Sequence, residues 1–161
     1  MITSLSFISL SIAEEFTLTP RQSEILELIL KGYSNGTISS QLGIAYNTAK
    51  NTISNLKLRV RMKTRYEILS YAFRLLAGDR AEQSISYISE KFALSPRESE
   101  VLLCLMDGDE VEAIGKRLYI SDETVNGHIS QILQKMIVAS RAQVMSTVLQ
   151  FVQTQVETEK S

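Results

Sequence analysis

Six lysine and arginine side chains lie close together in one short segment of this sequence. Residues 46–65 contain no Asp or Glu, and their cations are Lys50, Lys57, Arg59, Arg61, Lys63 and Arg65. Cations without opposing acids create a local positive potential, which attracts the phosphate groups of nucleic acids. The alternative is a solvated helix face, which on charge alone is the more common case. The choice therefore depends on the elements that carry these side chains.

Those cations fall on and just after a predicted helix over residues 46–61. A short helix at about residues 35–42 and a tight turn at Gly43 precede it. The apolar residues recur at spacings of four, three and four, which is one stripe of a helix, and they are Ala49, Ile53, Leu56 and Val60. The polar residues that fall outside the stripe and project outward together are Lys50, Asn51, Ser54 and Lys57. The pattern predicts a buried stripe behind a polar, cationic face.

The sequence repeats itself at a distance of 76 residues. Residues 11–26 align with residues 87–102 without a gap, and the register continues through Gly32 with Gly108 and Arg65 with Arg141. Internal repeats of this kind are the signature of duplicated structural units. We therefore predict two units of four to five helices each, at residues 1–78 and 79–161.

The start of one helix can be read directly in both units. Thr19 and Ser95 are N-cap residues followed by proline, and a Gln or Glu three residues later completes a capping box. The other predicted helices cover about residues 35–42, 46–61 and 65–77, then 111–118, 122–137 and 141–155, with a leading helix before each capped proline. No segment alternates with period two, so the predicted fold is all-α.

The repeated pattern resembles the LuxR/GerE-type helix-turn-helix family. The first copy reads LTPRQSEIL, GYSNGTISSQLGI and NTAKNTISNLKLRV, and the second reads LSPRESEVL, GDEVEAIGKRLYI and SDETVNGHISQILQKM. The resemblance covers about residues 16–150. It implies a winged-helix-like unit without a wing, whose third helix enters the DNA major groove and whose fourth often forms a dimer contact. The first copy departs from the pattern at Ala45, where a capping Ser is usual, and at Thr52, where His is common.

The resemblance also implies roles for residues of the first unit. Side chains in the positions that touch base edges are Lys50, Asn51 and Ser54. Lysine suits guanine O6 and N7, and asparagine suits adenine N6 and N7. The residues expected near the DNA backbone are Thr48, Arg59 and Arg65, to which charge alone adds Lys57, Arg61 and Lys63.

The second unit keeps the pattern but changes the charge. The matching, weaker DNA-binding positions are Thr124, Asn126, Ser130, Lys135 and Arg141. Gly127 offers no side chain to a base, and Asp122 and Glu123 stand where the third helix begins. Residues 1–78 contain nine Lys and Arg against five Asp and Glu, net +4, whereas residues 79–161 contain eight against thirteen, net −5. We expect the second unit to bind DNA weakly or not at all.

Two further features distinguish the second unit. Tyr119 replaces Gly43 in the turn, so this turn must change conformation or hold a strained left-handed residue. The last helix carries more apolar surface than one small unit needs to cover, which predicts an exposed stripe for a dimer or another partner. Its members are Val144, Val148, Phe151 and Val152.

Other functional classes find little support in the sequence. The single cysteine, Cys104, excludes an intrachain disulfide, and with one histidine there is no plausible zinc cluster. No catalytic set or phosphate loop occurs, so we expect no enzyme, metal, cofactor or small-molecule ligand. No apolar run reaches the length of a membrane span, and a cytoplasmic location fits. Since about 17 residues precede the first motif, we expect no receiver or inducer domain ahead of it.

The sequence therefore predicts a transcription regulator that binds double-stranded DNA. The first unit would read the major groove, and the second would supply dimerisation, an auxiliary DNA contact or a docking face for another regulator or RNA polymerase. The alternative is an adaptor or anti-activator that does not bind DNA and pairs with another LuxR-type regulator through its acidic half.

Overall fold

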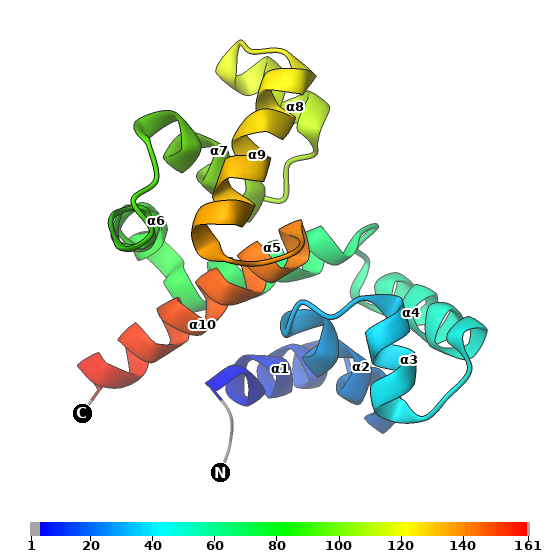
Figure 1. The fold of residues 1–161 in the computed structure, drawn as a ribbon. Coiled ribbons are helices and arrows are strands. Elements are labelled where there is room, and N and C mark those ends of the chain that lie inside the picture. The colour runs from blue at the N-terminus through cyan, green and yellow to red at the C-terminus, as the bar shows by residue number, and fades with distance from the viewer. Residues whose placement is uncertain (1–3, 161) are drawn as a thin grey trace.

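The computed structural model describes residues 4–160, which form α-helices and a single 3₁₀ turn (Figure 1). The first half contains α1 (Ser4–Glu15), α2 (Pro20–Leu30), α3 (Asn35–Leu42), α4 (Tyr46–Val60) and α5 (Arg65–Ala77). After the turn η1 (Gly78–Arg80), the second half contains α6 (Ala81–Lys91), α7 (Pro96–Met106), α8 (Val111–Leu118), α9 (Asp122–Met136) and α10 (Arg141–Glu159). No strand occurs within this described range, and the all-α prediction is confirmed.

The predicted helix starts are present in both halves. The Thr19 hydroxyl accepts a hydrogen bond from the backbone N–H of Gln22, and the Gln22 side chain accepts one from the N–H of Thr19. Ser95 and Glu98 form the same reciprocal pair at the start of α7. Each capping box satisfies two backbone donors that a helix N-terminus would otherwise leave unpaired. These local signals therefore fix α2 and α7 in equivalent places.

Most helix ends agree with the sequence analysis within one residue. The third helices, α4 and α9, each end one residue earlier than predicted, at Val60 and Met136. The last helix, α10, continues to Glu159, four residues beyond its predicted end. The predicted boundary between the two units falls at η1, where the chain leaves α5 for α6.

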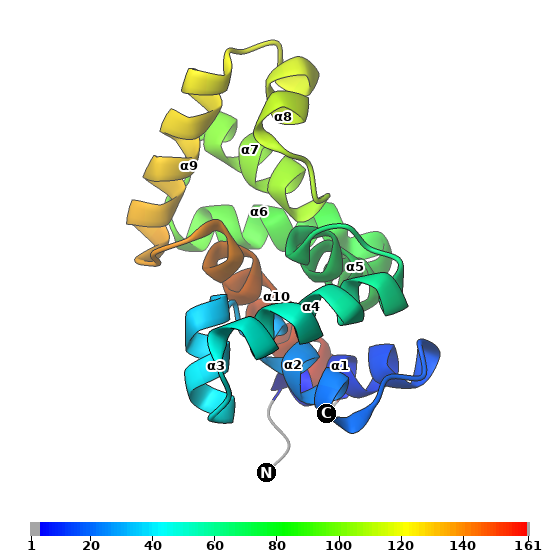
Figure 2. The same ribbon diagram turned by 90° about the vertical axis from the view of Figure 1, so that its right-hand side faces the viewer.

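The two halves share one core. Helices α5 and α10 pack along each other at the centre of the molecule, between α3 and α4 on one side and α8 and α9 on the other (Figure 2). Buried apolar side chains from Leu5 of α1 to Val152 of α10 belong to one continuous cluster. Since burial of apolar surface is the main stabilising term in folding, neither half keeps its whole core without the other.

The stripe predicted to be exposed on the last helix is buried. Val144 and Val148 have no exposed surface and Val152 is 2% exposed, because the neighbouring helices, chiefly α5, cover them. Phe151 is half-buried, with its ring centroid 5.8 Å from that of Phe92 and the Lys91 ammonium 4.9 Å from its centre. The expectation of an exposed stripe is therefore wrong: α10 finds its apolar partner within the chain.

The turn at Tyr119 keeps the left-handed conformation. Its φ of 59° and ψ of 43° match those of Gly43, at 62° and 35°. A left-handed residue with a side chain costs about 1–2 kcal/mol, because its Cβ approaches a carbonyl oxygen. Tyr119 is 94% exposed, so its side chain recovers little of that cost through packing. Of the two alternatives from the sequence, the strained turn is the one observed.

Replacing Tyr119 with glycine should therefore stabilise the protein by up to about 1 kcal/mol. The substitution relieves the strain of the left-handed residue, and the conformational entropy that glycine adds to the unfolded chain offsets part of this gain. Urea denaturation followed by circular dichroism measures the change. A lower midpoint for Tyr119→Gly would contradict the strain assigned to this turn.

Candidate nucleic-acid interface

Helix α4 is held by its apolar stripe. Each of the four predicted stripe residues is at most 3% exposed, and α4 packs against α2 and α3. Helix α3 begins at the N-cap Ser34 and ends at the left-handed Gly43. Ala45 then starts α4 without a side-chain hydrogen bond, as its missing hydroxyl predicted. The result is a helix-turn-helix whose second helix has one buried face and one free face.

The free face of α4 carries the predicted polar residues. Lys50, Asn51, Ser54 and Thr48 are exposed, and Lys57 is half-buried. The Ser54 hydroxyl donates to the Lys50 carbonyl at 3.0 Å, so its oxygen stays available as an acceptor. The amide of Asn51 and the ammonium of Lys50 point away from the stripe and make no hydrogen bond to the described part of the chain.

The structure adds two residues to this face. Asn47 is exposed one turn before Asn51, and the Leu58 side chain is 77% exposed one turn after Ser54. The four-residue spacing to Asn51 and Ser54 could have identified both from sequence. Leu58 is an exposed apolar group among cations, and such a group suits contact with the methyl of thymine.

Four cations on and after α4 have side chains without internal partners. Within residues 4–160, no hydrogen bond or ion pair involves the side chains of Lys50, Lys57, Arg61 and Lys63, although the backbone N–H of Lys63 donates to the Glu67 carboxylate at 2.7 Å. Arg61 is the left-handed residue that ends α4, and Lys63 follows in the exposed connection to α5. Their charge is not compensated within the molecule, so it is available to an external anion.

The other two predicted phosphate contacts are engaged within the chain. Arg59 donates to the carbonyls of Phe16 and Thr17 at 3.0 and 3.2 Å. Arg65 is half-buried and donates to the Tyr33 carbonyl at 2.8 Å and to the Asn35 side chain. Both guanidinium groups therefore join α4 and α5 to the loops beside them, a structural role that the sequence analysis did not predict.

The equivalent helix of the second unit presents a different face. The Ser121 hydroxyl caps α9 by accepting from the backbone N–H of Thr124 at 3.1 Å, as predicted. Thr124, Asn126 and Ser130 are exposed on its outer face. At its start the acidic Asp122 and Glu123 are exposed and form no salt bridge within the described residues. This face is polar and locally negative.

The cations around α9 are paired. Arg117 bonds Asp107 and Asp109 at 2.7 and 2.8 Å, which raises its pKa, and Lys116 bonds Glu112 at 2.7 Å. Arg141 donates to the Asp109 carbonyl at 2.7 Å, in the same manner as Arg65 in the first unit. Burial lowers the pKa of Arg141, and its side chain is only 11% exposed. The second unit thus neutralises internally the charge that the first unit leaves free.

Lys135 occupies the position of Arg59 and has the same structural role. Its ammonium lies 3.1 Å from the Ala93 carbonyl and 2.7 Å from a carboxylate oxygen of Glu98. Burial opposes the charged form of Glu98, but the hydrogen bonds from Lys135 and the Ser95 N–H outweigh it, so its pKa lies below the ordinary value. Glu98 is 6% exposed, whereas the Lys135 side chain is 34% exposed, so the pair is buried on the carboxylate side.

Replacing Glu98 with glutamine should destabilise the protein by about 2 kcal/mol, because it leaves the Lys135 ammonium without its carboxylate. Glutamine can still accept the capping hydrogen bond, as Gln22 does in the first unit. Alanine cannot, so Glu98→Ala should destabilise the protein by about 1 kcal/mol more than Glu98→Gln. Because the pKa of Glu98 is lower in the folded state, the pair contributes its full stability above the pKa that Glu98 has in the unfolded chain. This stability is lost as pH falls through the pKa of Glu98 in the folded protein. In chemical denaturation at decreasing pH, the difference in unfolding free energy between wild type and Glu98→Gln should therefore shrink; a difference that stays constant down to pH 3 would contradict this linkage.

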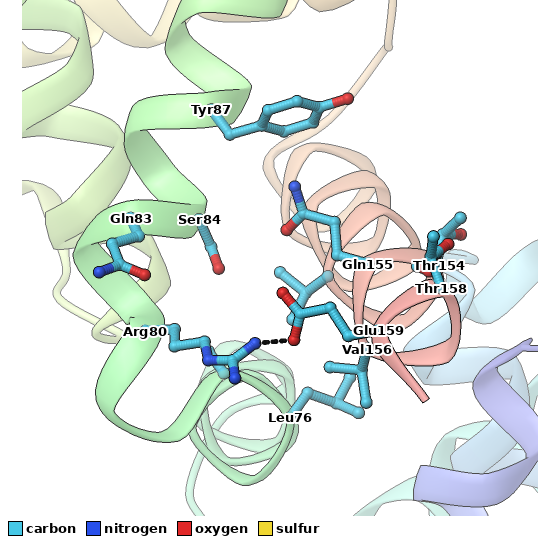
Figure 3. A pocket seen from close by; sticks show the side chains of 12 residues that line it. Leu76, Arg80, Gln83, Ser84, Tyr87, Thr154, Gln155, Val156, Thr158 and Glu159 are labelled. Atoms are coloured by element: carbon cyan, nitrogen blue, oxygen red, sulfur yellow. Dashed lines mark hydrogen bonds and ion pairs between the residues drawn. The ribbon is translucent and has the colours of Figure 1, made fainter. Parts of the chain in front are cut away.

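Other candidate sites lie away from α4. A groove of about 450 Å³ lies between α6 and the end of α10, where Arg80 forms an ion pair with Glu159 (Figure 3). Its lining includes Gln83, Ser84 and Tyr87 of α6. Among the described residues, no cluster of His, Cys, Asp and Glu could hold a metal ion, and no helix is long and apolar enough to cross a membrane. Cys104 is buried, and burial raises the pKa of its thiol.

Short helix pairs joined by left-handed turns define an all-α helix-turn-helix protein. The family model described as "Bacterial regulatory proteins, luxR family" matches residues 16–72 and 93–148, and the chain belongs to this family. Its members are DNA-binding transcription regulators rather than enzymes.

Two curated relatives illustrate the similarity. The transcriptional regulatory protein DegU of Brevibacillus brevis is 30% identical over 128 residues, which cover 76% of this chain and 54% of DegU. The response regulator protein VraR of Staphylococcus aureus is 42% identical over 57 residues, 35% of this chain and 27% of VraR. The chain thus spans about half of the first relative and about a quarter of the second. No solved structure matches it.

Proposed function

We propose that this protein is a sequence-specific transcription regulator with two tandem luxR-type units, at residues 1–78 and 79–161, of which the first reads DNA. The observation that carries the proposal is the free face of α4, where unpaired cations surround exposed amide and hydroxyl groups. The family membership supports DNA as the ligand. A cytoplasmic location, where the chromosome of a bacterium lies, is part of the same proposal.

In this proposal α4 lies in the major groove. Lys50 and Asn51 contact base edges, with lysine suited to guanine and asparagine to adenine. Ser54 and Thr48 add hydroxyl contacts to a base and to the backbone. Lys57, Arg61 and Lys63 meet phosphates along the groove, since their cationic side chains have no partner within the described chain. Arg59 and Arg65 fix α4 and α5 to the neighbouring loops through their hydrogen bonds to backbone carbonyls.

The second unit has a supporting role in this proposal. Its acidic helix start repels phosphates, and Gly127 cannot reach a base. It therefore makes at most an auxiliary DNA contact through Thr124, Asn126 and Ser130, and it leaves a face free for another regulator or RNA polymerase.

Salt dependence of DNA binding tests the proposal directly. If Lys57, Arg61 and Lys63 each neutralise one phosphate, log K should fall with log salt with a slope of about −2.7, at about −0.9 per contact. Gel-shift titrations on genomic fragments at several salt concentrations measure this slope. A slope near zero, or no binding at low salt, would reject the assigned face.

The second candidate function is an adaptor that pairs with another regulator without binding DNA. It is favoured by the exposed, unbridged Asp122 and Glu123, which could contact a partner's cationic helix. Capture of a LuxR-type regulator, combined with no DNA affinity at low salt, would select it. Capture that survives a Glu123→Lys substitution would count against the acidic contact.

A further inference from the structure

The contact between the two units is reciprocal. A Cβ on Gly32 would lie 3.0 Å from the Ala142 carbonyl oxygen and 3.1 Å from the Ser146 Cβ, so the end of α2 rests directly on α10. A Cβ on Gly108, at the end of α7, would lie 3.3 Å from the Ser70 Cβ on α5. At the repeat distance of 76 residues, Gly32 becomes Gly108 and Ser70 becomes Ser146. Each unit thus offers the other the same pair of surfaces.

The flanking helices follow the same exchange. Helix α1 of the first unit packs on α10 of the second, and α6 of the second packs on α5 of the first. The groove of Figure 3, lined by Gln83, Ser84 and Tyr87, has a counterpart of about 560 Å³ lined by Phe7, Ile8 and Ser11, each 76 residues earlier. Exchange of equivalent surfaces is the property that defines the interface of a two-fold symmetric dimer. Here both halves belong to one chain.

Specific polar contacts fix this interface. The buried Ser146 hydroxyl donates to the Leu30 carbonyl at 2.6 Å, and the Arg141 guanidinium lies 4.0 Å above the centre of the Tyr66 ring. The hydroxyl of Ser70 has no partner among the described residues, so the symmetry is approximate. With the Val144 and Val148 side chains fully buried, the surfaces used between the units are closed to a second copy.

We infer that the protein is a single-chain pseudo-dimer, in which the two units take the places of the two subunits of a dimer. Its DNA site is asymmetric, because one molecule binds one specific half-site, which α4 reads. This inference rests on the proposed function. A symmetric dimer presents two equal reading helices and matches a palindrome. Here the interface is internal, and the two reading faces differ, because α4 carries free cations whereas α9 begins with acids and carries Gly127. The second half-site position then receives little base-specific contact.

The first experiment tests closure of the interface without DNA. Light scattering coupled to gel filtration should give the mass of one chain, 18.1 kDa, over a wide concentration range. In a Cys104→Ala background, Ser70→Cys with Gly108→Cys places two Cβ atoms near disulfide distance across the interface. Oxidation should produce a cross-link within one chain on a non-reducing denaturing gel. A dimer mass, or a cross-link between two chains, would overturn the pseudo-dimer.

The second experiment tests the DNA site. Selection from random double-stranded DNA should enrich one unsymmetrical motif, bound by one chain per duplex. An inverted repeat bound by two chains would overturn the asymmetric site. If no motif is enriched and no duplex is bound at low salt, the DNA-binding function itself fails and the asymmetric site with it. The mass and the cross-link test the interface independently of DNA binding, so the two failures can be told apart.

Discussion

Replacing Lys50 and Lys57 together with glutamate should lower the affinity for DNA by at least about 100-fold, or about 3 kcal/mol. Both side chains lie on the outward side of α4, and neither has a partner among the described residues. Their loss breaks no internal contact, and the new carboxylates would face phosphates. The fold should keep most of its stability, since Lys50 is exposed, Lys57 is half-buried and neither side chain bonds another residue; surface substitutions of this kind usually change stability by less than about 0.5 kcal/mol. Gel-shift titration and urea denaturation measure the two quantities.

Two controls separate the face of α4 from net charge and from the second unit. Arg21→Glu with Arg74→Glu makes the same change in charge on exposed positions of α2 and α5, and binding should fall far less. Asn126→Glu alters the α9 position equivalent to Lys50, and the effect should stay within about threefold, because α9 is not the reading helix. Binding that resists the double substitution on α4 but collapses with Asn126→Glu would exchange the roles of the units.

Replacing Gly32 with valine should destabilise the whole protein by about 3 kcal/mol or more. The left-handed φ of 79° disfavours a branched side chain, and its Cβ would press against the backbone of α10 at 3.0 Å. Since the two units share one core, the loss should appear as a single transition at lower denaturant rather than as the melting of one half. Urea denaturation followed by circular dichroism measures it.

Gly43→Val is the matched control for this substitution. Gly43 is also left-handed, with φ of 62°, but nothing lies within 4 Å of an added Cβ. Only the strain of the left-handed backbone remains, so the free energy of unfolding should fall by about 1–2 kcal/mol. Equal losses for the two variants would show that the contact between α2 and α10 adds nothing, and two separate transitions would show that the halves unfold independently.

Features encoded by neighbouring residues were predictable from the sequence. The caps at Thr19 and Ser95, the buried stripe of α4 and the register of the repeat depend on side chains a few residues apart. Hydrogen bonds at a helix start and the period of an apolar stripe are properties of local geometry, which any fold built on these helices must respect. The outward positions of Lys50, Asn51 and Ser54 follow from the same period.

Charge pairing was not predictable in this way. A count of cations treated Arg59 and Lys57 alike, yet Arg59 bonds carbonyls more than 40 residues away and Lys57 bonds none. The same count could not show that Arg117 pairs with Asp107 and Asp109. Whether a charged side chain is unpaired depends on which distant groups the fold brings within hydrogen-bond distance. A local sequence pattern does not contain this information.

Local residue patterns encode the helices and the family to which the chain belongs, because caps, turns and apolar periods depend on neighbouring residues and recur at a distance of 76 residues. The packing of distant helices, in contrast, placed α10 against α5 and left the side chains of four cations on and after α4 without an internal partner. Local pattern and tertiary packing differ in this way because an apolar stripe specifies that it will be buried but does not specify which helix buries it. The choice between an internal and an external partner is made by the packing of the whole chain.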